Sequence, residues 1–132
     1  MRGTMFSEIL SKKKLRIKNK VVTLSSITSP KKGRKVVYAS DTRPSATTIA
    51  ASKDADLLIH ESSYSDQQAN LAKERKHSTA SEAARIAYRS KVKGLVLTHF
   101  SARYSDISQL LAEARKIFIA TTAGSDGYKI KL

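Results

Sequence analysis

Three short strand-like runs, each ending beside an acid or a histidine, constrain the fold of this chain more than any other feature. They are Arg34–Ala39 with Asp41 two residues later, Asp56–His60 followed by Glu61, and Gly94–Thr98 followed by His99. The last two runs are almost continuously apolar, which is typical of strands buried on both faces of a sheet. The sequence therefore predicts strands that deliver polar side chains at their carboxyl ends.

The segments between these runs carry helix signals. Residues 45–55 and 65–76 are rich in helix-forming residues. Thr79 and Glu82 have the spacing of a capping box, ahead of alanines that recur on one helical face. Asp106 is placed to cap another helix, whose apolar residues again recur at helical spacing. These segments predict helices before and after the buried strands along the chain.

Two further strands complete the predicted order. Val21–Ile27 is rich in branched residues, and the alternating segment 127–132 predicts an edge strand. The resulting order is β-β-α-β-α-α-β-α-β, which predicts an α/β fold with helices packed against a sheet. Its length of 132 residues is that of one domain.

The strand ends point to a site. Ligands in such sheets gather outside the carboxyl ends of the strands, where Asp41, His60–Glu61 and His99 fall. The third histidine, His77, lies in the connection before the predicted capping box. A lone histidine after a strand is more often structural, but three histidines and an acid at such positions favour a site. With no cysteine in the chain, an Asp/His ligand set suits zinc or manganese in a hydrolytic centre.

The positive charge is concentrated near the N-terminus. The net charge is +14, and Met1–Lys35 holds eleven Lys and Arg residues against a single acid. Such a segment attracts polyanions, most commonly nucleic acid, although a solvated basic surface is the alternative interpretation. The candidate RNA-binding residues are Lys12, Lys13, Lys14, Arg16, Lys18 and Lys20.

Nothing in the sequence indicates a membrane or secreted protein. No apolar run approaches the ~18 residues of a membrane helix, and Met1 does not begin a signal peptide. The absence of cysteine also excludes disulfides. We therefore expect a cytoplasmic location and no membrane partner.

Four linked motifs resemble the C-terminal half of ribonuclease Z, the tRNA 3′-processing endoribonuclease of the metallo-β-lactamase superfamily. They occur in the family's order, in the stretches "GRKVVYASDTRPS", "DADLLIHESSY", "KHSTASEAARIA" and "VKGLVLTHFSARY". The resemblance implies half of a metallo-β-lactamase αβ/βα sandwich. It implies a basic N-terminal segment with the first strand over residues 1–30, and the ribonuclease Z-like half over 31–132.

The resemblance also implies roles for individual residues. Asp41 and His99 would be metal ligands in a site that holds two zinc ions in the intact family. His77 would contact the scissile phosphate and assist proton transfer to the leaving 3′ oxygen, and Glu61 would orient His77. Arg103 would hold phosphate. His60 receives no ligand role. Small departures from the family pattern occur at Ser40, Ser62 and Ser63.

Half of the family's site has no counterpart here. The family carries a His-x-His-x-Asp-His signature upstream of the matched region, whereas no histidine precedes Asp41. We therefore expect partial or absent zinc binding, an inactive chain when alone, and a separately encoded N-terminal half as partner with tRNA precursor as substrate. The alternatives are a catalytically inactive truncated homologue that self-associates or binds RNA, and an unrelated α/β nucleic-acid-binding domain. The uncovered sheet face predicts a homo-oligomer when no partner covers it.

Overall fold

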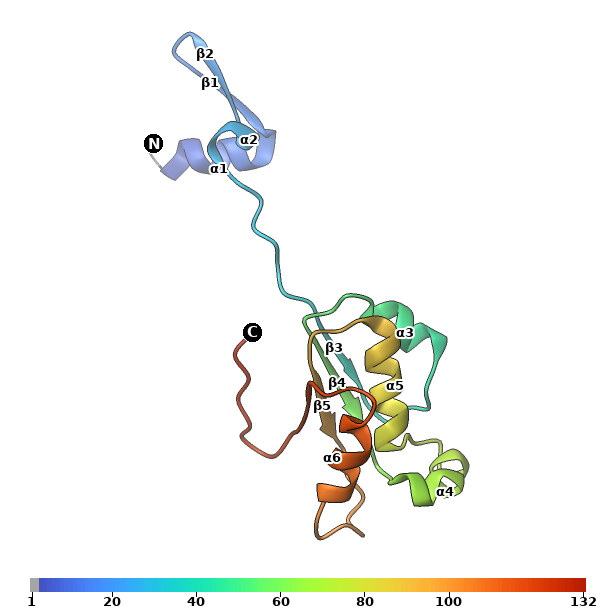
Figure 1. The fold of residues 1–132 in the computed structure, drawn as a ribbon. Coiled ribbons are helices and arrows are strands. Elements are labelled where there is room, and N and C mark those ends of the chain that lie inside the picture. The colour runs from blue at the N-terminus through green and yellow to red at the C-terminus, as the bar shows by residue number, and fades with distance from the viewer. Residues whose placement is uncertain (1–2) are drawn as a thin grey trace. The chain divides into compact units, whose positions relative to one another are not determined.

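The computed structural model describes residues 3–132, which divide into two compact units, one ending at Gly33 and the other beginning at Arg34. Figure 1 shows both units as a ribbon. The first unit contains α1 (Gly3–Lys12), the antiparallel hairpin of β1 (Lys14–Ile17) and β2 (Lys20–Thr23), and α2 (Leu24–Ile27).

The predicted strand over Val21–Ile27 is wrong in its second half. β2 ends at Thr23, whose backbone N–H donates to the Ser26 hydroxyl at 3.2 Å in a capping box that opens α2. Serine and threonine compete well for backbone hydrogen bonds at helix starts, and here that preference ends the strand. α1 and β1 were not predicted from the sequence.

The second unit is built on a four-stranded parallel sheet, which confirms the predicted α/β class. The strand order is β3-β4-β5-β6, so β3 lies at one edge. Its strands are β3 (Val36–Ala39), β4 (Leu57–Glu61), β5 (Leu95–Thr98) and β6 (Thr121–Ala123).

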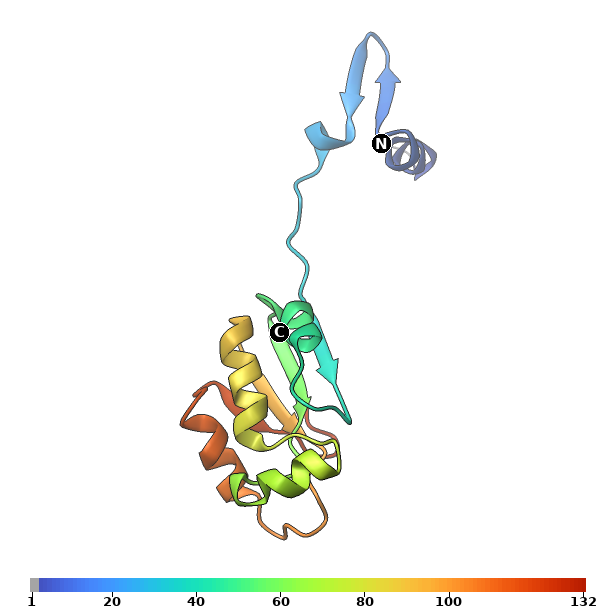
Figure 2. The same ribbon diagram turned by 90° about the vertical axis from the view of Figure 1, so that its right-hand side faces the viewer.

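The helices α3 (Ala46–Ser52), α5 (Ala80–Ser90) and α6 (Ser108–Arg115) pack on one face of the sheet, as Figures 1 and 2 show from two directions. The 3₁₀ turn η1 (Asp66–Gln68) and α4 (Ala69–Glu74) lie beyond the carboxyl ends of the strands. The predicted alanine face of α5 is fully buried against β4 and β5, where small side chains allow close approach to Leu58 and Leu97. The predicted capping box forms: Thr79 accepts from the Glu82 N–H, and a Glu82 oxygen accepts from the Thr79 N–H at 2.9 Å.

Two boundaries near the C-terminus differ from the prediction. Residues 127–132 form no strand, because Thr121–Ala123 already takes the place beside β5. Asp106 accepts hydrogen bonds from both the backbone N–H and the hydroxyl of Ser108, but α6 begins only at Ser108, so the acid lies one position before the cap.

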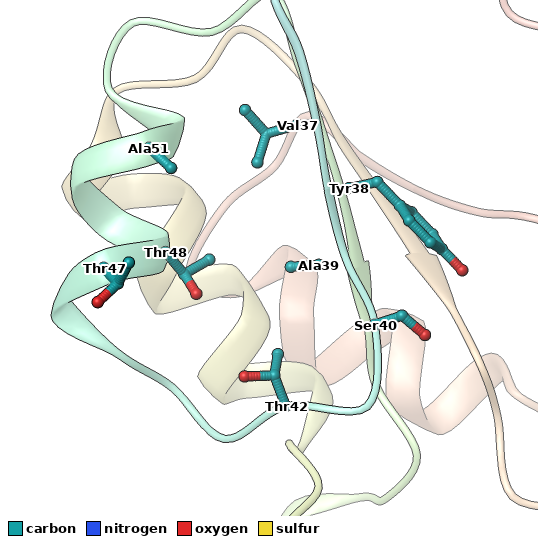
Figure 3. A pocket seen from close by; sticks show the side chains of 8 residues that line it. All are labelled: Val37, Tyr38, Ala39, Ser40, Thr42, Thr47, Thr48 and Ala51. Carbon is teal, nitrogen blue, oxygen red and sulfur yellow. The ribbon is translucent and has the colours of Figure 1, made fainter.

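The opposite sheet face is apolar and partly uncovered. Strand alternation directs Val37 and Ala39 towards the helices and Tyr38 away from them, as Figure 3 shows. Tyr38 is 67% exposed and its neighbour on the same face, Val36, is 47% exposed. Further along this face, the C-terminal segment approaches Ile59 and Val96 and forms a pocket with them.

Candidate metal and phosphodiester site

Three predicted side chains meet beyond the carboxyl ends of the strands. Asp41 follows β3, His99 follows β5, and His77 comes from the loop before α5. The Asp41 Oδ1 atom lies 3.1 Å from His99 Nε2 and 4.0 Å from His77 Nδ1. The two imidazole rings stack with centroids 5.2 Å apart. One potential ligand atom from each residue lies within 4.8 Å of the others.

The backbone at Asp41 and His99 is left-handed, with φ of 48° and 56°. This conformation costs a residue with a side chain roughly 1–2 kcal/mol, so it persists only where surrounding structure holds it. Asp41 lies two residues after β3, and His99 directly follows β5. Both left-handed residues therefore lie just beyond the carboxyl ends of parallel strands, where their side chains meet.

A buried carboxylate lies behind this cluster. Glu61 is fully buried at the end of β4 and accepts five hydrogen bonds. Oε1 accepts from the Thr42 N–H and from His77 Nδ1, both at 2.8 Å. Oε2 accepts from the N–H and hydroxyl of Ser63 and from the Ser78 N–H at 3.0–3.2 Å. Glu61 thus joins the loops that carry Asp41 and His77 to Ser63, and its contact with His77 is the one that the resemblance implies.

Arg43 was missed as a site residue, although it belongs to the Asp-Thr-Arg motif. Its guanidinium pairs with both carboxylate oxygens of Glu82 and donates to the His77 carbonyl. The hydroxyl of Ser78 donates to the Thr42 carbonyl, a second tie between these loops. Arg43 therefore fixes the His77 loop to the first turn of α5, a role visible only when three distant segments are placed together.

Arg103 is outside the three-residue cluster. It is exposed, with its guanidinium 5.2 Å from the Tyr64 ring centroid and Nη1 3.2 Å from Gln68 Oε1. The Tyr64 ring centroid is in turn 6.2 Å from that of His77. The Tyr64 ring therefore lies between Arg103 and His77, on the His77 side of the site.

His60 has a structural position. It is fully buried, and Nδ1 lies 2.7 Å from the Glu61 carbonyl oxygen. Burial is the main cause that lowers the pKa of His60 from its ordinary value of 6.5. Within residues 3–132 no hydrogen-bond partner is found for Nε2. A neutral imidazole suits this apolar surrounding.

The six basic candidates lie in the first unit, at the end of α1 and on the β1–β2 hairpin. All six side chains are exposed. Lys12 forms an ion pair with Glu8 at 2.7 Å, which reduces its availability for a polyanion.

A separate pocket lies between β3 and α3 (Figure 3). It contains hydroxyl groups but no histidine or acid, and so offers no metal-binding donor set. Its lining residues are Val37, Tyr38, Ala39, Ser40, Thr42, Thr47, Thr48 and Ala51.

The Asp41–His77–His99 cluster fits a divalent cation. One carboxylate oxygen and two imidazole nitrogens form a donor set that suits zinc or manganese. The geometry also brings two good acceptors, Asp41 Oδ1 and His99 Nε2, within 3.1 Å, which is favourable only with a proton or cation between them. Three donors are enough for one cation and too few for two.

Sequence comparison finds ribonuclease Z repeatedly. No family model matches the chain. Ribonuclease Z of Gemmatimonas aurantiaca is 52% identical over 103 residues, covering 77% of this chain and 33% of that protein. The enzyme of Methanosarcina acetivorans is 38% identical over 132 residues, covering 98% of this chain and 43% of that protein. The chain thus spans between a third and a half of the length of these curated relatives.

Solved structures give the same result. Human tRNase Z, short form, superimposes with a TM-score of 0.54 and 33% identity, covering 79% of this chain and 33% of that one. A metallo-β-lactamase fold protein from Bacillus subtilis superimposes with a TM-score of 0.66 and 29% identity, covering 72% of this chain and 39% of that one. No helix within residues 3–132 has the length and apolarity required to cross a bilayer. Together with the ordered motifs, these similarities establish that the chain is a homologue of ribonuclease Z and carries part of the metallo-β-lactamase fold.

Proposed function

We propose that residues 31–132 contribute part of the active site of a zinc-dependent endoribonuclease that cuts tRNA precursors at their 3′ side. The observation that carries this proposal is the convergence of Asp41, His77 and His99 at one sheet edge, with Glu61 buried behind them. The relatives named ribonuclease Z supply the reaction class.

In this proposal Asp41 and His99 hold zinc, which supplies Lewis-acid activation of water and phosphate. His77 contacts the scissile phosphate and passes a proton to the leaving 3′ oxygen. Glu61 accepts from His77 Nδ1, so the proton-transferring atom of His77 is Nε2. Arg103 binds a neighbouring phosphate with its planar fork of donors, beside Tyr64.

The rest of the active site comes from polypeptide outside these 132 residues. The ligand set supports this proposal, because Asp41 and His99 alone are too few for the two zinc ions of the family's centre. The apolar face of the sheet, with Tyr38 and Val36 largely exposed, supports it independently. We propose that this face packs against the completing part, and that copies of the isolated chain associate through it.

We further propose that the six basic candidates of the first unit bind tRNA phosphate. Five of these six exposed residues form no ion pair within the part of the chain that the structure describes. Their charge would add affinity without sequence preference. The basic first unit and the incomplete ligand set also favour a second candidate function, that of an inactive RNA-binding homologue.

Complementation distinguishes the two functions. The chain alone should bind fewer than two zinc ions per molecule and leave a tRNA precursor uncut. Adding the portion of Methanosarcina acetivorans ribonuclease Z that this chain does not match should restore chelator-sensitive 3′ cleavage. Asp41→Asn should abolish the restored activity, whereas Asp54→Asn is the matched control, because Asp54 is exposed and also left-handed, with φ of 54°. Binding of tRNA without cleavage in every mixture would favour the inactive homologue.

A further inference from the structure

The Ser63 hydroxyl has three neighbours and a single proton. Ser63 is almost fully buried, and its Oγ lies 3.0 Å from Glu61 Oε2 and 3.0 Å from the His99 carbonyl oxygen. The third neighbour is His99 Nδ1 at 2.9 Å. A carbonyl oxygen only accepts, and the Glu61 carboxylate is already the acceptor for three N–H groups and a histidine.

These contacts determine which atom donates at Nδ1. If the hydroxyl donated to His99 Nδ1, it would face two oxygen acceptors at 3.0 Å with no proton between. If Nδ1–H donates to Oγ, the hydroxyl proton is free for one of the two oxygens, so two of the three contacts are hydrogen bonds instead of one. The contacts of Ser63 therefore favour the second arrangement.

The position of the proton on Nδ1 leaves the lone pair of neutral His99 on Nε2. That atom faces Asp41 Oδ1 at 3.1 Å, at the proposed cation position. Glu61 holds His77 in the same way but directly, through Nδ1 at 2.8 Å. One buried carboxylate thus acts on both imidazoles, on one by direct contact and on the other through a serine.

We propose that Ser63 is a positioning residue that extends the hold of Glu61 to His99, fixing the Nδ1–H tautomer so that Nε2 faces the cation. The proposal rests on the zinc site proposed above. Groups that orient a histidine ligand through its second nitrogen typically contribute about 10- to 100-fold in metal affinity. Ser63 has no contact with the cation position itself.

Zinc titration of the full chain tests this role with closely matched variants. Ser63→Ala should weaken zinc binding about 10- to 100-fold. Ser63→Thr should restore it, because threonine keeps the hydroxyl. Ser62→Ala is the control, since Ser62 is a buried neighbour whose hydroxyl lies 3.3 Å from the Thr98 carbonyl instead. Equal affinity for the wild type and Ser63→Ala would overturn the proposal.

Nitrogen-15 NMR of the histidine rings gives a readout that needs no zinc. In the zinc-free chain Asp41 favours a proton on Nε2 and Ser63 favours one on Nδ1, so the Nδ1–H share of neutral His99 should be larger in the wild type and in Ser63→Thr than in Ser63→Ala. In Ser63→Ala the proton should move towards Nε2, where Asp41 accepts it. If the wild type binds no zinc but the tautomer still differs between the wild type and Ser63→Ala, the metal site is refuted and the role of Ser63 is retained. Equal shares of the Nε2–H tautomer in the wild type and in Ser63→Ala would refute that role.

Discussion

Replacing Glu61 by glutamine should destabilise the second unit, although the two side chains have nearly the same size. Oε1 accepts from two donors, the Thr42 N–H and His77, and Oε2 accepts from the backbone N–H groups of Ser63 and Ser78. A glutamine amide has one acceptor oxygen, and its NH₂ group can replace Oε1 or Oε2. In the first case His77 Nδ1 can become the acceptor and the Thr42 N–H loses its partner; in the second the N–H groups of Ser63 and Ser78 both lose theirs. The mutation should therefore leave at least one donor unsatisfied.

The magnitude follows from the more favourable orientation, with one donor unsatisfied. A buried unsatisfied donor costs about 1–3 kcal/mol. That is a sizeable part of the ~5–15 kcal/mol by which a domain is stable. At about 2 kcal/mol, a unit of this size should lose roughly 8–16 °C in its melting temperature.

Urea unfolding followed by circular dichroism measures the loss. Glu74→Gln is the matched control, because Glu74 is exposed on α4; its stability should change by less than ~0.5 kcal/mol. A loss below ~1 kcal/mol for Glu61→Gln would refute the reasoning, since the donors would then have found other partners.

Three further perturbations test other parts of the molecule. Burial lowers the pKa of His60, so the native state favours neutral imidazole; its stabilising effect is complete above pH 6.5 and falls as the pH decreases below that value. His60→Leu should therefore flatten the stability profile measured by urea unfolding at acidic pH, and an unchanged slope would contradict the assignment. Tyr38→Asp should shift the isolated chain towards monomer in light scattering, because it places a charge on the uncovered face; an unaltered assembly would exclude that face. Replacing Lys14 and Arg16 together by glutamate should weaken tRNA binding and reduce its salt dependence in filter binding, and an unchanged salt slope would locate the RNA contacts elsewhere.

The sheet of the second unit was predictable because its strands are short, apolar and bounded. Leu58 and Leu97 lie on the helix-facing side, and the alanines of α5 give a helical period that no strand would share. The N-terminal unit was harder to predict because its pattern is dominated by charge. Ile9 is the residue of this unit that is fully buried in the described structure, so little apolar periodicity marks α1 and the hairpin.

The wrong strand over 127–132 has a different cause. Alternation of polar and apolar residues predicts a strand only where a neighbouring strand can pair with it. Thr121–Ala123 takes the position beside β5, although it lacks a strong alternating pattern. Tyr128 and Ile130 instead contribute to the pocket with Val96 on the sheet face. The apolar residues of the tail thus contact the sheet without extending it.

The site residues divide in the same way. Asp41, His77 and His99 could be found from their residue types and from the rule that strand ends converge, since an acid or imidazole at such a position suggests chemistry. Arg43 and Ser63 act through partners 34 to 39 residues away in the sequence. A serine after a strand predicts nothing about a histidine ring, because its effect depends on which neighbour already holds the hydroxyl proton. The donors around Glu61 come from segments that are distant in the sequence and meet only in the folded chain. The orientation of both imidazoles therefore depends on the tertiary structure around this carboxylate.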